Sequence, residues 1–190
     1  MKKILIIQAN PKKDSYCHSL AESYQKGAMH SGAEIQWIEL CDLKFNISFD
    51  GIPVKEIEPD LIDAQEKIRW ADHLVFIYPT WWATFPALLK GFFDRVFSSG
   101  FAFRYRANTW RWDKLLSGKS ARLIVTMDSP PLFYRLFTKQ PGHNAVKKGT
   151  LQFCGVNPVK ITSIGPVKGS SEIRRKKWLE KIEQLGFKQI

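Results

Sequence analysis

Residues 73–86 read HLVFIYPTWWATFP, and the stretch continues through residue 97 as ALLKGFFDRVF. Its first six residues are almost continuously apolar, which is typical of a strand buried on both faces of a parallel sheet. Pro79 suits the end of such a strand because its ring fixes φ and removes a backbone donor. Pro86 suits the first position of a helix. The stretch therefore predicts a buried strand, a short rigid loop and a helix.

Four more segments have the character of strands, and helical patterns separate them. Strands are expected at residues 3–8, 34–40, 120–127 and 158–165. The alternating polarity of residues 34–40 is typical of a strand near a sheet edge. Leu20, Tyr24 and Ala28 recur at helical spacing before Gly32, which predicts a helix with a C-terminal stop. Further helices are expected at 60–71, from 86, around 143–152, and after Ser170 or Ser171 as N-cap.

Alternation of strands and helices predicts an α/β fold, a doubly wound five-stranded parallel sheet with helices on both faces in three layers. Right-handed crossovers favour the strand order 2-1-3-4-5, the flavodoxin-like topology. The sequence contains no linker or repeat, so residues 1–190 are expected to form a single domain. Ligands of such folds bind outside the carboxyl ends of the strands, where strands one and three diverge. The predicted site is therefore made by the loops QANPKKDSYC, YPTWWATFP and TMDSPPLFY.

The net charge of +11 is concentrated in the second half of the chain. Residues 1–100 carry 11 Lys and Arg against 13 Asp and Glu, a balance of −2, whereas residues 101–190 carry 18 against 5, a balance of +13. Such asymmetry suits phosphate-bearing ligands, nucleic acid or a membrane surface, and a solvated face is the alternative. Ile173, Leu179 and Ile182 are expected to face the sheet, which leaves the run RRKKW in solvent. No nucleic-acid-binding motif accompanies it, so no nucleic acid partner is expected.

Several chemistries find no support in the sequence. Cys17, Cys41 and Cys154 lack the C-x-x-C spacing, which suits a reducing, cytoplasmic location rather than a disulfide framework. The apolar run at residues 4–7 is too short for a signal peptide, and no run is long enough to span a membrane. The chain has no G-x-G-x-x-G, P-loop or G-x-S-x-G motif, and no metal-ligand spacing.

Two of the three loops carry polar or aromatic groups suited to a ligand. Asp14 or Ser15 is expected near the N-terminus of the first long helix, where free backbone N–H groups bind phosphate. A simple helix cap is the alternative. Trp81 and Trp82, held between two prolines, offer aromatic surface beside backbone donors, which suits a planar heterocycle. A tryptophan that covers the sheet edge or a dimer interface is the alternative.

The segment YPTWWATFPALLKGFFDRVF resembles the F-P-x-x-W-x-x-x-P-A-x-L-K-G-x-x-[DE]-R-V motif of the flavodoxin-like NAD(P)H:quinone oxidoreductases. The likeness extends to the first loop, to GFAFRY and to LQFCGVNPV, and so covers nearly the whole chain. This family includes quinone reductases, modulator-of-drug-activity proteins and ancillary reductases of potassium efflux systems. The positions that agree in register are Pro79, Trp82, Pro86, Ala87, Leu89, Lys90, Gly91, Arg95 and Val96.

The resemblance implies a bound flavin, FMN or FAD, that NAD(P)H reduces and a quinone or similar acceptor reoxidises in the same pocket, with ping-pong kinetics. Where relatives often carry T-T-G-G, this chain has T-M-D-S followed by two prolines. Trp81 stands where relatives carry other residues, which makes it a candidate for substrate preference. The flavin-binding positions that the resemblance implies are Asn10, Ser15, Cys17, Pro79, Thr80, Trp81, Trp82, Ala83, Thr126, Asp128 and Ser129.

The resemblance also implies a tyrosine and a histidine that stabilise charge on the reduced flavin. Tyr134 matches the tyrosine in register. The position of the histidine holds Gln140, and His143 follows three residues later, so His143 is the catalytic candidate and a structural role is its alternative. An FAD would place its AMP half along the first loop and residues 170–175, where Glu172 and Arg174 could serve.

The relatives are homodimers, which implies a second copy of this chain as partner. Candidates for the interface are residues 101–105 and the apolar face of the helix after residue 86, with core packing as the alternative for that face. A second functional class stays open, in which the protein is a flavin-binding regulatory subunit of a membrane transport system. The apolar face of the helix after residue 86, named above as an interface candidate, consists of Phe92, Phe93, Val96 and Phe97.

Overall fold

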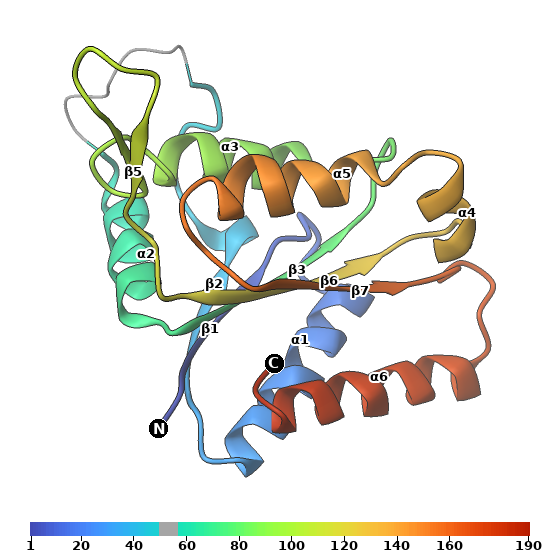
Figure 1. Cartoon of the computed structure of the whole chain (residues 1–190). Helices are drawn as coiled ribbons and strands as arrows, with labels where there is room; N and C mark the ends of the chain where they lie inside the picture. The colour runs from blue at the N-terminus through green and yellow to red at the C-terminus, as the bar shows by residue number, and fades with distance from the viewer. Residues whose placement is uncertain (50–56) are drawn as a thin grey trace.

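A five-stranded parallel sheet forms the middle layer of the protein, whose computed structural model describes residues 1–49 and 57–190 (Figure 1). The strand order is β2-β1-β3-β6-β7, which confirms the predicted flavodoxin-like topology. Each strand lies within two residues of its predicted bounds. The five strands are β1 (Lys3–Gln8), β2 (Glu34–Glu39), β3 (His73–Pro79), β6 (Ser120–Thr126) and β7 (Val159–Ile164).

Helices cover both faces of the sheet, as predicted (Figure 1). On one face lie α1 (Tyr16–His30) and α6 (Glu172–Phe187). On the other lie α2 (Pro59–Trp70), α3 (Ala87–Val96), and α5 (Pro141–Asn144) with the π-helix Ala145–Gln152 that continues it. A single 3-10 turn, Leu40–Asp42, follows β2. In the described part of the chain, no helix combines the length and apolar composition needed to cross a membrane.

Strand β3 is buried on both faces because its side chains alternate between two cores. Leu74, Phe76 and Tyr78 pack beneath α2 and α3, whereas Val75 and Ile77 pack against α1 and α6. Six consecutive residues, His73 to Tyr78, are at most 2% exposed. This confirms the double burial that the apolar run predicts.

The helices α1 and α6 pack against each other at close range. Leu20, Tyr24 and Ala28 of α1 are fully buried, as their spacing predicts. Gly27 and Gly186 let the two backbones approach, because a Cβ added at Gly186 would overlap the carbonyl oxygen of Tyr24. The tertiary contact therefore depends on two glycines that stand far apart in the sequence.

The expected orientation of α6 is wrong at one residue. Ser171 caps the helix, with its Oγ accepting a hydrogen bond from the Arg174 N–H at 3.3 Å, and Ile182 is buried as expected. Ile173, however, is 71% exposed. Ile182 lies nine positions further along the helix, which leaves the two side chains roughly half a turn apart on opposite sides of the helix.

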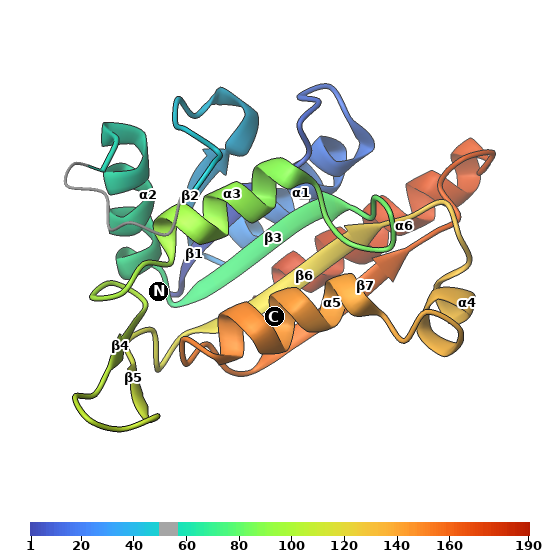
Figure 2. The same ribbon diagram turned by 90° about the horizontal axis from the view of Figure 1, so that it is seen from above.

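Two elements differ from the sequence-based expectation. Residues 101–119 contain an antiparallel hairpin, β4 (Phe103–Tyr105) and β5 (Trp112–Lys114), which projects from the body (Figure 2). The loop after β6 contains α4 (Pro131–Leu136), which begins at Pro131. Two adjacent prolines indicate a loop, but a proline in the first turn of a helix loses no hydrogen bond.

The proposed interface on α3 is also wrong. Phe92, Phe93, Val96 and Phe97 are at most 6% exposed and pack into the core of this chain. The core-packing alternative therefore holds for this face of α3. Within residues 101–105, Phe101 and Ala102 are buried as well, whereas Tyr105 is 61% exposed on the hairpin.

Candidate functional site

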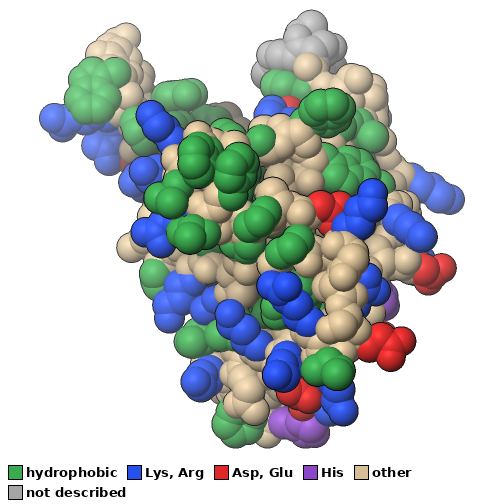
Figure 3. Space-filling view, turned by 90° about the vertical axis from the view of Figure 1, so that its right-hand side faces the viewer, with side chains coloured by type: hydrophobic (Ala, Val, Ile, Leu, Met, Phe, Trp, Pro, Cys, Tyr) green, Lys and Arg blue, Asp and Glu red, His purple; other side chains and the backbone are tan. Residues whose placement is uncertain are grey.

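The three predicted loops meet at the carboxyl end of the sheet, which faces the viewer in Figure 3. The Ala9 N–H donates to the Ile77 carbonyl at 2.8 Å, and the Thr80 N–H donates to the Thr126 carbonyl at 2.7 Å. Cys17 Sγ lies 3.3 Å from Thr126 Oγ1. Burial raises the pKa of the Cys17 thiol, which the hydrogen bonds from Thr126 and Asn10 only partly offset. The structure thus brings Cys17, Thr80 and Thr126 together as predicted, with Asn10 beside Cys17.

Buried polar atoms without partners gather at the ends of β1 and β3. Gln8 Nε2, Ser15 Oγ, the Tyr78 hydroxyl and Thr80 Oγ1 are enclosed, and none of them makes a hydrogen bond with residues 1–49 or 57–190. Burial raises the pKa of Tyr78, so its hydroxyl is neutral. Most buried polar groups in proteins are hydrogen-bonded, and a group of unpaired ones indicates a missing partner such as a ligand.

Gln8 and Tyr78 belong to this site although the sequence analysis did not propose them. Both are at most 1% exposed, and each stands at or near the carboxyl end of a strand whose central residues are apolar. The sequence signal that could have identified them is a polar residue at the end of a strand that is otherwise buried. Ser15 occupies the N-cap position of α1, but its side chain makes no capping hydrogen bond, so its hydroxyl stays available.

The loop after β3 is a tight turn with unusual backbone angles. Trp81 and Thr84 exchange backbone hydrogen bonds of 2.8 and 3.2 Å. Between them Trp82 and Ala83 have φ angles of 51° and 59°, a conformation that costs about 1 kcal/mol or more for a non-glycine residue. The Trp82 side chain is 99% exposed and the Trp81 side chain 47%. The turn is therefore held by its backbone, whereas the Trp82 side chain extends into solvent rather than packing between the prolines.

Tyr134 of α4 fixes this turn from the other side. Its hydroxyl donates to the Ala83 carbonyl at 2.8 Å and accepts from the Gly142 N–H at 3.1 Å. The side chain is 3% exposed, and burial raises the pKa of the phenol. Gly142 leaves no room for a side chain, because a Cβ there would lie 2.8 Å from the Thr84 Cα. One hydroxyl thus joins the β3–α3 loop to α4 and α5.

His143 lies next to Tyr134, with 5.0 Å between the ring centroids. Its Nε2 lies 2.9 Å from Ser163 Oγ, and the residue is 2% exposed. Burial lowers the pKa of His143 to about 4, so the ring is neutral at pH 7. The structure therefore brings the two predicted catalytic side chains together, and gives each a structural hydrogen bond.

We expect the neutral state of His143 to make stability depend on pH. Because its pKa is about 4 in the folded chain and ordinary in the unfolded chain, the unfolded chain binds an extra proton between these values. Stability is then complete above about pH 6.5 and falls by up to about 3 kcal/mol as the pH drops toward 4. Urea unfolding at several pH values measures the loss.

His143→Gln is the matched variant, because glutamine can bond Ser163 but does not titrate. Its stability should fall less on acidification than that of the wild type. His73 also contributes to the loss of stability in acid, and it does so equally in both proteins. Its pKa is lowered to about 3, mainly by burial and to a smaller extent by the charges of Lys2, Arg122 and Lys160. If the wild type and His143→Gln lost the same stability on acidification, burial would not lower the pKa of His143.

Asp128 and Ser129 line the site less closely than predicted. Asp128 is exposed, and its Oδ1 accepts from the Lys168 N–H at 2.9 Å, which ties this loop to the one before α6. Ser129 is partly exposed. The carboxylate of Asp128 therefore orders two neighbouring loops, a role that the sequence analysis did not propose.

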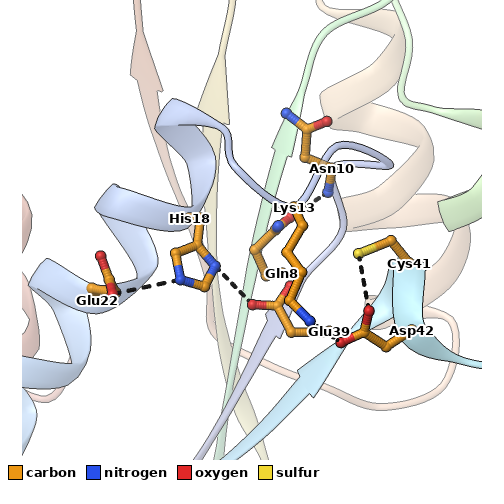
Figure 4. Close-up of polar contacts among 8 residues, drawn as sticks. All are labelled: Gln8, Asn10, Lys13, His18, Glu22, Glu39, Cys41 and Asp42. Atoms are coloured by element: carbon orange, nitrogen blue, oxygen red, sulfur yellow. Dashed lines mark hydrogen bonds and ion pairs between the residues drawn. The ribbon is translucent and has the colours of Figure 1, made fainter.

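Charged side chains border the first loop on the side of β2 (Figure 4). Lys13 Nζ lies 2.5 Å from Asp42 Oδ2, and His18 Nδ1 lies 2.8 Å from Glu39 Oε1. Burial raises the pKa of Glu39, and the neighbouring His18 only partly offsets this. Acidic and basic groups are thus paired along this border of the loop.

The N-terminus of α6 borders the first loop on the opposite side. The Tyr16 hydroxyl donates to the Arg175 carbonyl at 2.9 Å, and the Arg175 guanidinium lies 5.9 Å from the Tyr16 ring centroid. Arg175 Nε also donates to Ser170 Oγ at 3.0 Å. Residues 170–175 therefore lie beside the first loop, as the sequence analysis expects. Arg174 instead lies over Trp178, 5.0 Å from its ring.

A family profile described as the flavodoxin-like fold matches residues 2–185. The chain belongs to the flavodoxin-like fold family. This flavodoxin-like chain is 30% identical over 182 residues to NAD(P)H dehydrogenase [quinone] 1 of Cavia porcellus, covering 82% of this chain and 65% of the relative. It is 28% identical over 183 residues to an uncharacterized NAD(P)H oxidoreductase of Haemophilus influenzae, covering 93% of this chain and 90% of the relative.

Solved structures agree with the flavodoxin-like assignment. A protein of Streptococcus mutans UA159 superposes with a TM-score of 0.82 at 29% identity, over 98% of this chain and 99% of that one. An NAD(P)H:quinone oxidoreductase of Methanothermobacter marburgensis superposes with a TM-score of 0.80 at 23% identity, over 99% and 96%, which supports the fold alone. The flavodoxin-like chain spans slightly less than two thirds of the guinea-pig relative, 65% of its length.

Proposed function

We propose that this protein is a flavin-dependent oxidoreductase that transfers electrons from NAD(P)H to a quinone-type acceptor. The observation that carries the proposal is a group of four buried polar atoms at the ends of β1 and β3 and at the N-terminus of α1, which have no hydrogen-bond partner among the described residues. They suit a ligand rich in oxygen and nitrogen at the place where doubly wound folds bind one. The names of the relatives, NAD(P)H dehydrogenase [quinone] and NAD(P)H oxidoreductase, support electron transfer from a nicotinamide to a quinone.

The residues of the site fit a flavin. Ser15 Oγ and the free N–H groups at the start of the 15-residue helix α1 suit its phosphate. Thr80 and the backbone of residues 81–83 suit the edge of its ring, with Asn10 and Cys17 beside them. When bound, a flavin accepts a hydride from NAD(P)H and delivers electrons to a quinone. Donor and acceptor would use one pocket in turn, so initial rates at several acceptor concentrations should give parallel double-reciprocal lines.

Tyr134 and His143 are the proposed catalytic side chains. His143 is neutral, and Tyr134 keeps its proton because burial raises its pKa. The single Tyr134 proton donates to the Ala83 carbonyl and would have to turn from it to serve a bound ring. Such donors would stabilise negative charge that develops on a reduced ring. Their contact at 5.0 Å places them next to the turn that suits the flavin edge.

Tyr134→Phe should slow flavin reduction by about 10-fold or more while flavin stays bound. The variant also loses the hydroxyl that joins Ala83 to Gly142, at a cost of about 1–3 kcal/mol in stability. Stopped-flow reduction by NADPH and urea unfolding separate the two effects. An unchanged reduction rate together with the loss of stability would leave Tyr134 a purely structural residue.

We propose that the protein forms a homodimer through the face between α3 and the π-helix. A groove of about 420 Å³ runs there, and its exposed or partly exposed lining includes Phe49, Phe85, Phe103 and Phe153, whereas Phe93 and Phe97 are core side chains beneath it. An apolar groove of this kind suits a partner subunit, and the exposed Tyr105 ring lies 5.3 Å from the ring of Phe103 in its lining. Light scattering of the purified protein measures the stoichiometry.

The proposed function is tested first by the purified protein itself. It should be yellow, lose its colour on addition of NADPH or NADH, and regain it on addition of a quinone. Acid release of the ligand followed by chromatography distinguishes FMN from FAD. A colourless protein that takes up neither flavin would contradict the proposal. A cytoplasmic location is proposed from the three free cysteines, and co-purification with a membrane transporter would instead favour a regulatory subunit.

A further inference from the structure

The short helix α4 exposes a cluster of large apolar side chains. Leu132, Phe133, Leu136 and Phe137, which we call the α4 patch, are 49–72% exposed. The rings of Phe133 and Phe137 stack at 4.6 Å with 22° between their planes, so the patch has a preformed shape. The core residue of this helix is Tyr134, which is 3% exposed. Packing within the chain therefore explains why Tyr134 is present on α4, but it does not explain the apolar side chains of the α4 patch.

The α4 patch lies in a stretch of the chain that contains basic but no acidic residues. Residues 129–171 contain six Lys and Arg and no Asp or Glu. Two of these cations, Arg135 and Lys139, belong to α4 or the loop that follows it, and both are exposed. Figure 3 shows this face of the molecule, where hydrophobic side chains lie among Lys and Arg side chains. The surface thus combines apolar side chains with positive charge.

The α4 patch also borders the candidate active site. The Tyr134 hydroxyl, on the same helix, bonds the Ala83 carbonyl in the turn that carries Trp82. Trp82 is 99% exposed, so another large aromatic side chain extends into solvent from an element joined to α4. Whatever contacts the α4 patch therefore comes close to the end of the sheet where the loops converge.

We propose that the α4 patch docks the protein on an anionic lipid surface. Exposed Leu, Phe and Trp side chains beside Lys and Arg are the combination that binds the interface of a bilayer: the apolar groups enter the acyl boundary and the cations attract the headgroups. The patch lies on one six-residue helix, whereas a stable protein interface needs about 20–30 residues on each side. The absence of acidic residues from 129–171 complements negative headgroups. Where the proposed function holds, such docking would bring membrane-dissolved quinones to the site.

Sedimentation of the purified full-length protein with vesicles tests the proposal. We expect binding to vesicles of phosphatidylglycerol and phosphatidylcholine, and weaker binding to phosphatidylcholine alone. Leu136→Ser with Phe137→Ser should weaken binding at least about 10-fold. Arg135→Gln with Lys139→Gln should weaken it roughly 30-fold, and high salt should also weaken it. All four side chains are exposed, so folding should persist, which circular dichroism verifies.

Met29→Ser with Phe187→Ser is the matched control. These side chains are 58% and 54% exposed at the ends of α1 and α6 away from α4, and their loss should leave vesicle binding unchanged. Failure of the wild type to bind anionic vesicles, or equal binding by the α4 variants, would overturn the proposal. So would α4 variants that lower the dimer population instead of vesicle binding, since the patch would then contact a second copy. Because the readout is binding rather than turnover, its outcome is independent of the flavin proposal.

Discussion

Ser15→Ala combined with Thr80→Val should weaken flavin binding roughly 100-fold relative to the wild type. Both hydroxyls are buried without a hydrogen-bond partner in the described part of the chain, one at the N-terminus of α1 and one at the end of β3. A hydrogen bond to a charged phosphate contributes about 1.5–3 kcal/mol and one to a neutral group about 1 kcal/mol, and the two removed bonds together give this loss. Titration of the flavin-free protein, followed by flavin fluorescence, measures the dissociation constant.

The same double variant should be more stable than the wild type when flavin is absent. An unpaired buried hydroxyl costs about 1–3 kcal/mol, and its removal relieves that cost. The opposite signs of the two effects distinguish a ligand-binding role from a general packing role. Ser23→Ala is the control, because its hydroxyl already donates to the Ser19 carbonyl on the same helix and should not affect flavin. Unchanged flavin affinity in the double variant would remove both hydroxyls from the binding site.

Gly186→Ala should destabilise the protein by about 3 kcal/mol or more. A Cβ at this position would overlap the Tyr24 carbonyl oxygen, which belongs to the backbone of α1 and cannot rotate away. The helices α1 and α6 must then separate, and the buried Leu20, Tyr24 and Ile182 lose packing. Urea unfolding measures the change in the free energy of unfolding.

Gly149→Ala is the matched control for this substitution. Gly149 lies in the π-helix with no atom close to where a Cβ would be, so alanine there should change stability by no more than about 1 kcal/mol. If Gly186→Ala lowered the free energy of unfolding no more than this control, α1 and α6 would not lie as close together as described. Gly186→Ala should also bind flavin more weakly, because α1 positions Ser15 beside the end of β1.

Much of the fold and part of the site could be predicted from the sequence. The apolar run at 73–78 indicates a strand buried on both faces, and alternation with helices leads to the observed strand order. Because the carboxyl ends of parallel strands share one edge, the loops that contain Cys17, Thr80 and Thr126 could be expected to meet. The motif around Trp82 and the match at Tyr134 then supplied the ligand and catalytic hypotheses. The single-domain organisation of residues 1–190 stays a prediction.

Other features depend on contacts between residues that are distant in the sequence. The apolar face of α3 suits an interface as well as a core, and only its packing against β3 decides for the core. The hydroxyl of Tyr134 bonds a carbonyl 51 positions away, and this bond joins the β3–α3 turn to α4. Gln8 and Tyr78 look like ordinary strand residues until their polar atoms are found to have no partner.

The sequence by itself determined the five strands of the main sheet, their order and the end of the sheet that carries the site, because periodicity and loop chemistry are local properties. The tertiary structure decided which polar atoms are left unpaired, which apolar side chains stay exposed on α4, and how closely α1 approaches α6. These depend on the distances between side chains of different elements, and such distances are fixed only when the helices pack on the sheet.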